Sequence, residues 1–113
     1  MNPKIHEIWL VAFPFSNLAS HKLRPALVLA VHRQEAIILG IFSKIPDGDL
    51  PETWILVSDK DKSFERTGLK KTSLIRADKI ATVNEAVFQR KLGNKLPESV
   101  EPVNSALRKS LDL

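Results

Sequence analysis

Cysteine is absent from the 113 residues, and its absence excludes several classes of site. A chain without thiols forms no disulfide bond and supplies no thiolate nucleophile, zinc ribbon or iron–sulfur ligand set. Glycine is scarce, with four residues, and none of them belongs to a glycine-rich phosphate loop or a nucleophile elbow. The three histidines are dispersed, with no spacing typical of metal ligands. The sequence therefore predicts neither a metal nor another cofactor.

Long hydrophobic runs are also lacking. The longest are Ala26–Val31 and Ala36–Phe42, far short of the roughly 20 residues that span a bilayer. The N-terminal residues lack the charged and apolar regions of an export signal. We therefore expect a cytoplasmic protein with no membrane association.

The overall composition is that of a globular protein. Hydrophobic residues make up 43% and charged residues 27%, which excludes disordered and collagen-like chains. A chain of this length holds one hydrophobic core, so we expect a single domain over residues 1–113. The net charge of +4, from 17 basic and 13 acidic residues, suits an anionic partner such as nucleic acid or an acidic protein.

Short apolar segments separated by turn-forming residues predict a chain built mainly of strands. A hairpin turn is expected at residues 33–35 and an exposed loop, rich in proline and aspartate, at Ser43–Thr53. Residues 72–83 fit either one bent strand or two strands. The segments are Ile5–Phe13, Ala26–Val31, Ala36–Phe42, Trp54–Val57, Thr72–Ala77 with Lys79–Val83, and Val87–Leu92.

The C-terminal residues change from strand to helix periodicity. Val100, Val103, Leu107 and Leu111 are spaced as one stripe of an amphipathic helix, and Ser99 is expected as its N-cap. Several short strands followed by one helix predict a mainly β fold, a small antiparallel barrel capped by a C-terminal helix.

Six sequence blocks then occur in one order: His6–Pro14, Arg24–Leu29, Ser43–Pro46, Gly68–Lys71, Arg76–Thr82 and Arg90–Gly93. In that order they resemble the MazF/PemK family of toxin endoribonucleases over nearly the whole chain. The resemblance implies an SH3-like barrel and a homodimer. It further implies metal-independent, sequence-specific cleavage of single-stranded RNA by attack of the 2′-hydroxyl group. A small acidic antitoxin protein would silence the toxin and bind DNA together with it.

Such cleavage needs a base, an acid and positive charge at the phosphorus. The resemblance suggests Asp78 as the base and Arg76, two residues earlier, as its partner on the same strand face. Arginine donates protons poorly, so we expect an electrostatic role for Arg76. The alternative is a surface ion pair worth less than about 1 kcal/mol. Arg24 matches the catalytic arginine of the family and suits a phosphate; otherwise it is a solvated loop residue.

The third strand departs from the family pattern. MazF-type toxins carry a Thr-Ser pair where this chain has Phe42-Ser43. Ser43 is a candidate for the missing hydroxyl, but it would project from the opposite side of the strand. Phe42 is either a core residue or a stacking platform for a base. His21 resembles a histidine of PemK-type toxins and is either a proton donor or a solvated loop residue.

Loop residues complete the candidate site. We expect RNA contacts from the polar and aromatic loop after the first strand and from lysines beside the site. Lys70 and Lys71 add positive charge but are interpreted as solvated. The proposed RNA-binding residues are Phe15, Ser16, Asn17, Lys22 and Lys44.

Two other functions remain open. Gyrase-inhibiting toxins resemble the same barrel and bind a protein through the end of the C-terminal helix, but their tryptophan-bearing tail is replaced here by Ser110–Leu113. A relative that has lost catalysis and only binds RNA or its antitoxin is the second alternative, because Phe42 stands in place of the threonine.

Overall fold

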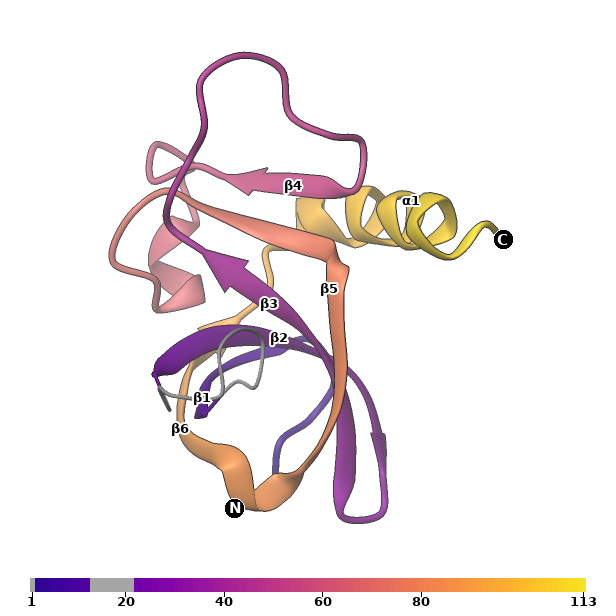
Figure 1. Cartoon of the computed structure of the whole chain (residues 1–113). Helices are drawn as coiled ribbons and strands as arrows, with labels where there is room; N and C mark the ends of the chain where they lie inside the picture. Colours follow the sequence, from indigo (N-terminus) through magenta and orange to yellow (C-terminus); the bar gives the residue numbers. More distant parts are fainter. Residues whose placement is uncertain (1, 13–21) are drawn as a thin grey trace.

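The computed structural model describes residues 2–12 and 22–113, and its strands form one antiparallel sheet (Figure 1). The order of the six strands is β4-β5-β3-β2-β1-β6, so β4 and β6 are the edges of a strongly curled, barrel-like sheet. The predicted mainly β fold with a C-terminal helix is confirmed. The elements are β1 (Glu7–Ala12), β2 (Leu23–His32), β3 (Glu35–Phe42), β4 (Trp54–Val57), β5 (Ser73–Asn84), β6 (Phe88–Asn94) and α1 (Val100–Leu111).

The fifth strand is continuous and bent, which settles the alternative left open for residues 72–83. Leu39 of β3 pairs with Ile80, but its neighbour Gly40 pairs with Arg76. Residues 77–79 of β5 therefore have no counterpart on β3. Extra residues on one strand of a pair bend it and increase its twist, and Figure 1 shows the resulting corner in β5.

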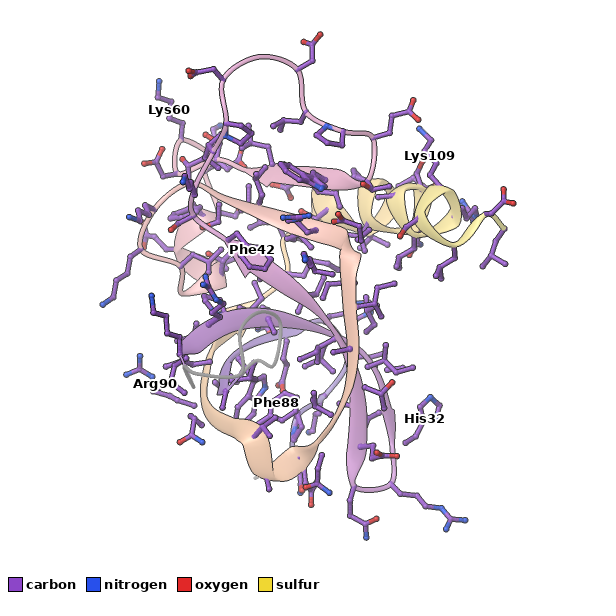
Figure 2. All side chains as sticks on the ribbon, in the orientation of Figure 1. His32, Phe42, Lys60, Phe88, Arg90 and Lys109 are labelled. Carbon is purple, nitrogen blue, oxygen red and sulfur yellow. The ribbon has the colours of Figure 1, made fainter. Side chains whose placement is uncertain are left out.

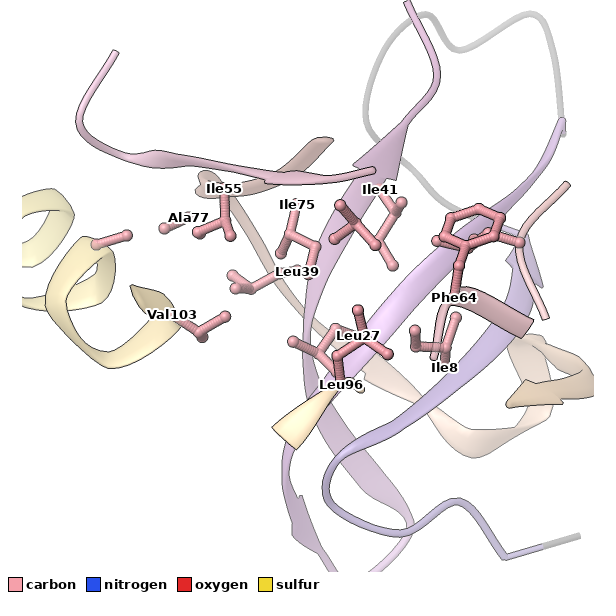
Figure 3. Packing of buried hydrophobic residues seen from close by; sticks show 13 residues of the cluster. Ile8, Leu27, Leu39, Ile41, Ile55, Phe64, Ile75, Ala77, Leu96 and Val103 are labelled. Atoms are coloured by element: carbon pink, nitrogen blue, oxygen red, sulfur yellow. The ribbon is translucent and has the colours of Figure 1, made fainter. Parts of the chain in front are cut away.

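Two buried clusters lie on opposite faces of the curled sheet. Successive residues of a strand point to opposite faces, so Leu27 joins one cluster while Val28 joins the other. The larger cluster packs the sheet against α1 and the short helix η1 (Phe64–Thr67) (Figure 3). Burial on both faces explains why β2 and β3 are almost continuously apolar.

The helix buries the middle of the predicted stripe but not its ends. Val103 is buried together with Ala106, and Leu107 packs against the larger cluster, whereas Val100 and Leu111 are 40% and 52% exposed. Near the end of α1, the hydroxyl group of Ser110 donates to the carbonyl oxygen of Ala77 in β5 at 2.7 Å. Ser99 precedes the helix as predicted, but its side chain makes no capping hydrogen bond.

The segments between the strands follow the sequence predictions in part. Residues 43–53 form a loop without helix or strand. Residues 59–71 contain η1, where the Thr67 hydroxyl donates to the carbonyl oxygen of Phe64 at 2.7 Å. The first strand begins at Glu7 rather than Ile5, because His6 lies in a turn with φ of 73°. The loop expected after the first strand lies in residues 13–21, outside the described residues.

No helix of the described part of the chain is long and apolar enough to span a membrane.

Two glycines fix the segment around η1 against β6. A Cβ atom on Gly93 would lie 2.1 Å from the carbonyl oxygen of Arg66, and one on Gly68 would lie 2.0 Å from that of Leu92. These contacts are with backbone atoms, which cannot rotate away. Close backbone packing at these glycines therefore holds the segment that follows η1 in place.

We expect Gly93→Ala to lower the free energy of unfolding by about 1–3 kcal/mol or more through steric overlap. Thermal unfolding followed by circular dichroism would show a drop of roughly 5–15 °C in Tm. Gly48→Ala is the control, because a Cβ atom there meets nothing within 4 Å and the substitution strains only the local backbone. Equal Tm values for the Gly93 variant and the unchanged protein would contradict this packing.

Candidate functional site

Neighbouring strands bring aromatic and arginine side chains to one face of the sheet. Trp54 of β4 pairs with Arg76 of β5, and Arg76 also pairs with Gly40 of β3. Phe42 lies two residues beyond Gly40 on β3, and therefore on the same face. Because Gly40 has no side chain, this part of the face has room for the larger groups around it. We call Arg24, Phe42, Trp54 and Arg76 the arginine–aromatic cluster.

The planar groups of this cluster lie against one another. The guanidinium carbon of Arg76 is 4.2 Å from the ring centroid of Trp54 and 5.5 Å from that of Phe42. The guanidinium carbon of Arg24 is 5.3 Å from the Phe42 centroid. Distances below about 6 Å are typical of cation–π contacts worth about 0.5–1 kcal/mol at exposed sites. Phe42 is half-buried and belongs to neither core cluster, so its interpretation as a core residue is wrong.

Asp78 holds Arg76 through two hydrogen bonds. Nε of Arg76 donates to Oδ1 of Asp78 at 3.0 Å, and Nη2 donates to Oδ2 at 2.6 Å. The two side chains thus lie together, as their spacing in the sequence predicts. The hydrogen bonds from Arg76, with a further one from Trp54, lower the pKa of the Asp78 carboxyl group although burial opposes this. Asp78 is consequently a carboxylate throughout the neutral range.

Two hollows meet at Arg24, which lines both. The first, of about 360 Å³, is lined by four cationic side chains together with Ser43, and we call it the cationic hollow. Its cations are Arg24, Lys70, Lys71 and Arg90. The second, of about 370 Å³, is the aromatic hollow. It is lined by Arg24, Phe42, Lys44, Pro46, Trp54, Leu74 and Arg76. Figure 2 labels Phe42 and Arg90, which mark the two hollows.

The structure brings most of the predicted catalytic residues together but separates one. The arginine–aromatic cluster contains two of them, Arg24 and Arg76, and Asp78 is hydrogen-bonded to Arg76. Lys44, predicted to bind RNA, lines the aromatic hollow. Ser43 lines the cationic hollow instead, on the other side of β3 from Phe42, as alternation along a strand requires.

Of the five remaining candidates, the structure describes Lys22. Lys22 is exposed and lines neither hollow. Four candidates lie outside the described residues: Phe15, Ser16, Asn17 and His21.

Sequence reasoning missed several residues of the site. Trp54 was assigned only to a strand, because its half-buried position on the edge strand β4 follows from the fold and not from the sequence. Lys70 and Lys71 were interpreted as solvated, although they line the cationic hollow. Arg90 appeared only within a family block, and its place beside Arg24 depends on the pairing of β1 with both β2 and β6.

The charge of the site comes from side-chain cations. Within residues 2–12 and 22–113, no three histidine, aspartate or glutamate side chains are grouped so that they could hold a metal ion. Guanidinium groups offer fixed pairs of N–H donors that match phosphate oxygens. The arrangement can therefore bind a phosphodiester at Arg24 and planar groups beside Phe42.

Comparison with known proteins identifies related chains. A family model described as "PemK-like, MazF-like toxin of type II toxin-antitoxin system" matches residues 4–111. No relative was found among curated protein sequences.

Several solved structures share the fold. A mycobacterial endoribonuclease in complex with its cognate antitoxin is 19% identical, with a TM-score of 0.74 over 99% of this chain and 97% of that chain. A MazF toxin of Mycobacterium tuberculosis is 19% identical, with a TM-score of 0.73 over 95% and 97% of the two chains. MazF of Deinococcus radiodurans is 16% identical, with a TM-score of 0.70 over 98% and 97%.

We expect Arg76→Gln to raise the pKa of Asp78 toward its ordinary value near 3.9, because the variant removes the charge that stabilises the carboxylate. Titration of the side-chain carboxyl carbon by ¹³C NMR would measure the shift. Arg108→Gln, which removes a guanidinium group from the helix surface, is the control. If the pKa of Asp78 were the same in Arg76→Gln and in the unchanged protein, Arg76 would not be the cause of its lowering.

The same interaction fixes the sign of the pH dependence of stability. The pair stabilises the fold above the ordinary pKa of aspartate, and this contribution is lost as the pH falls through the lowered folded-state value. Because the side chains of Arg76 and Asp78 are 23% and 38% exposed, the contribution is below about 1 kcal/mol.

Proposed function

The chain belongs to the PemK-like, MazF-like toxins of type II toxin–antitoxin systems, and from this membership we propose that its arginine–aromatic site cuts single-stranded RNA. The observation that carries the proposal is the pair of guanidinium groups beside one ring, one of them oriented by a carboxylate. Two fixed cations next to a carboxylate provide what phosphodiester cleavage by an internal nucleophile needs.

The reaction forms one bond and breaks one. The ribose 2′-oxygen attacks the adjacent phosphorus, and the bond from phosphorus to the 5′-oxygen of the next nucleotide breaks. The products are a 2′,3′-cyclic phosphate and a 5′-hydroxyl end. Negative charge grows on the phosphate oxygens in the transition state, and preorganised donors at such oxygens lower the barrier. Arg24 and Arg76 supply these donors.

Asp78 acts in two ways. Its two hydrogen bonds fix the plane of the Arg76 guanidinium group, which leaves Nη1 of Arg76 for the phosphate. As a carboxylate it also takes the proton of the 2′-hydroxyl group. The departing 5′-oxygen takes its proton from solvent or from an acid other than Arg76, because a guanidinium group stays protonated at neutral pH.

The cationic hollow binds the RNA backbone on the other side of Arg24. Lys70, Lys71 and Arg90 line it with Ser43, and lysine and arginine bind phosphates with an affinity that falls as the salt concentration rises. Ser43 donates its hydroxyl hydrogen to a backbone phosphate there.

We further propose a wider assembly for this activity. The chain works as one domain, residues 1–113, in the cytoplasm as a homodimer. A small acidic antitoxin protein silences this chain. The chain's net charge of +4 favours binding of an acidic protein, which competes with RNA for the site.

The first test incubates the purified protein with a long single-stranded RNA in excess EDTA and maps the cuts and their end groups. We expect recurrent cuts with cyclic phosphate ends, and a rate lower by about 10²–10³-fold in Arg24→Ala, which removes a transition-state donor. Arg33→Gly is the matched control, because it removes the same charge from the tip of the β2–β3 hairpin, where φ of 58° suits glycine.

Intact RNA with the folded protein would contradict ribonuclease activity and favour a relative that only binds. If both Arg24→Ala and Asp78→Asn still cut RNA at the rate of the unchanged protein, the chain would be a ribonuclease, but the arginine–aromatic cluster would not be its active site.

The pH dependence of the rate identifies the base. With Asp78 as the base, the lowered pKa of its carboxyl group predicts a rate that is constant from about pH 8 to pH 5 and falls only below about pH 4. Single-turnover cleavage over this range would measure it. A fall in rate centred near pH 6.5, abolished by His21→Gln, would transfer the role to the histidine.

A further inference from the structure

We propose that the aromatic hollow holds one unpaired base of the RNA, next to the phosphate that is cut, and selects guanine or uracil there. Phe42 is then a specificity-determining residue. The inference rests on the proposed function, since it names the part of the substrate that this site reads.

The lining of the hollow suits a flat aromatic ligand. Phe42 and Trp54 contribute rings, and the guanidinium groups of Arg24 and Arg76 lie against them at 4.2–5.5 Å. Single-stranded bases stack both on aromatic side chains and on arginine planes. A volume of about 370 Å³ is at the lower end of the range of small-ligand pockets, which fits one base rather than a longer segment.

The shared residue sets the position of the base along the RNA. Arg24 lines the aromatic hollow on one side and the cationic hollow on the other. An RNA strand can place its phosphates in the cationic hollow and one of its bases in the aromatic hollow. Such a strand passes Arg24 on its way from one hollow to the other. The base in the aromatic hollow belongs to a nucleotide next to the phosphate that Arg24 contacts. The aromatic hollow therefore selects the base at one position of the RNA sequence.

The charged side chains of the lining select the edge of the base. They are Arg24, Lys44 and Arg76, and all of them only donate hydrogen bonds. The Asp78 carboxylate is not part of the lining. At carbon 6 of a purine and carbon 4 of a pyrimidine, guanine and uracil carry a carbonyl oxygen that accepts from such donors, whereas adenine and cytosine carry an amino group that donates. The hollow therefore favours keto bases.

Cut-site mapping on a randomised RNA tests the selection. We expect the unchanged protein to prefer guanine or uracil over adenine and cytosine by at least about 10-fold at one position next to the cut. Phe42→Leu, which keeps an apolar side chain but removes the ring, should abolish most of that preference and leave preferences elsewhere intact. Leu56→Ala is the control, because Leu56 is exposed on β4 and lines neither hollow.

An unchanged preference in Phe42→Leu would overturn the inference, and so would a preference for adenine or cytosine at the position that Phe42→Leu alters. Either result would leave the ribonuclease activity standing.

A binding measurement tests the hollow without catalysis. The chain has no tyrosine and two tryptophans, and Trp9 is buried edge-on against Phe88. Trp9→Phe thus leaves Trp54 as the one indole fluorophore. The probes are tetranucleotides of deoxyuridine, of deoxycytidine and of abasic sites, which lack the 2′-hydroxyl nucleophile. We expect deoxyuridine to quench Trp54 with a Kd at least about 5-fold below that of deoxycytidine, and abasic probes not to quench.

Should Trp9→Phe fail to fold, the unchanged protein and Trp54→Phe form the comparison, and the quenching should disappear in Trp54→Phe. Equal quenching by the abasic probe would overturn the inference. Base-dependent quenching without any RNA cleavage would support the hollow and contradict the proposed function.

Discussion

The contact of two guanidinium groups with the Phe42 ring is the interaction on which the site depends. Arg24 and Arg76 carry like charges, which repel unless neighbouring groups offset them. The ring of Phe42 and that of Trp54 offer their negative faces, and the Asp78 carboxylate neutralises one of the two charges. A phosphate between the arginines would supply the remaining negative charge.

The bend in β5 makes this arrangement possible. Ala77 points into the core and its N–H donates to the carbonyl oxygen of Thr53 at 2.8 Å, while its carbonyl oxygen accepts from Ser110 of α1. The backbone is thus held on both sides of the bend, and Asp78 emerges beside Arg76. The helix therefore contributes to the site without reaching it, because it anchors the strand that carries the ion pair.

The sequence predicts those features that depend on nearby residues. Alternation and turn residues identify β2, β3 and their hairpin, and a spacing of two residues places Arg76 beside Asp78. The opposite directions of Phe42 and Ser43 follow from the same alternation. The buried face of α1 was predicted in part: Val103 and Leu107 face the core, whereas Val100 and Leu111 at the ends of the stripe do not. The hydrogen bond of Ser110 to β5 follows from no apolar pattern.

Contacts between distant segments could not be predicted in this way. Trp54 and Arg76 meet through the register of β4 against β5, and Lys70, Lys71 and Arg90 join Arg24 only through the curl of the sheet. The family blocks provided candidate site residues but did not predict that Phe42 faces both arginines. Only the folded chain shows that the residue replacing the family's threonine lies at the centre of the site.

A crystal structure of the protein with an RNA that carries a 2′-deoxyribose at the cut site tests the central claim most directly. We expect a phosphate on Arg24, the 2′-deoxyribose beside Asp78, and the neighbouring base in the aromatic hollow with Phe42 and Trp54. An RNA bound on another face, with the arginine–aromatic cluster still exposed to solvent, would contradict it.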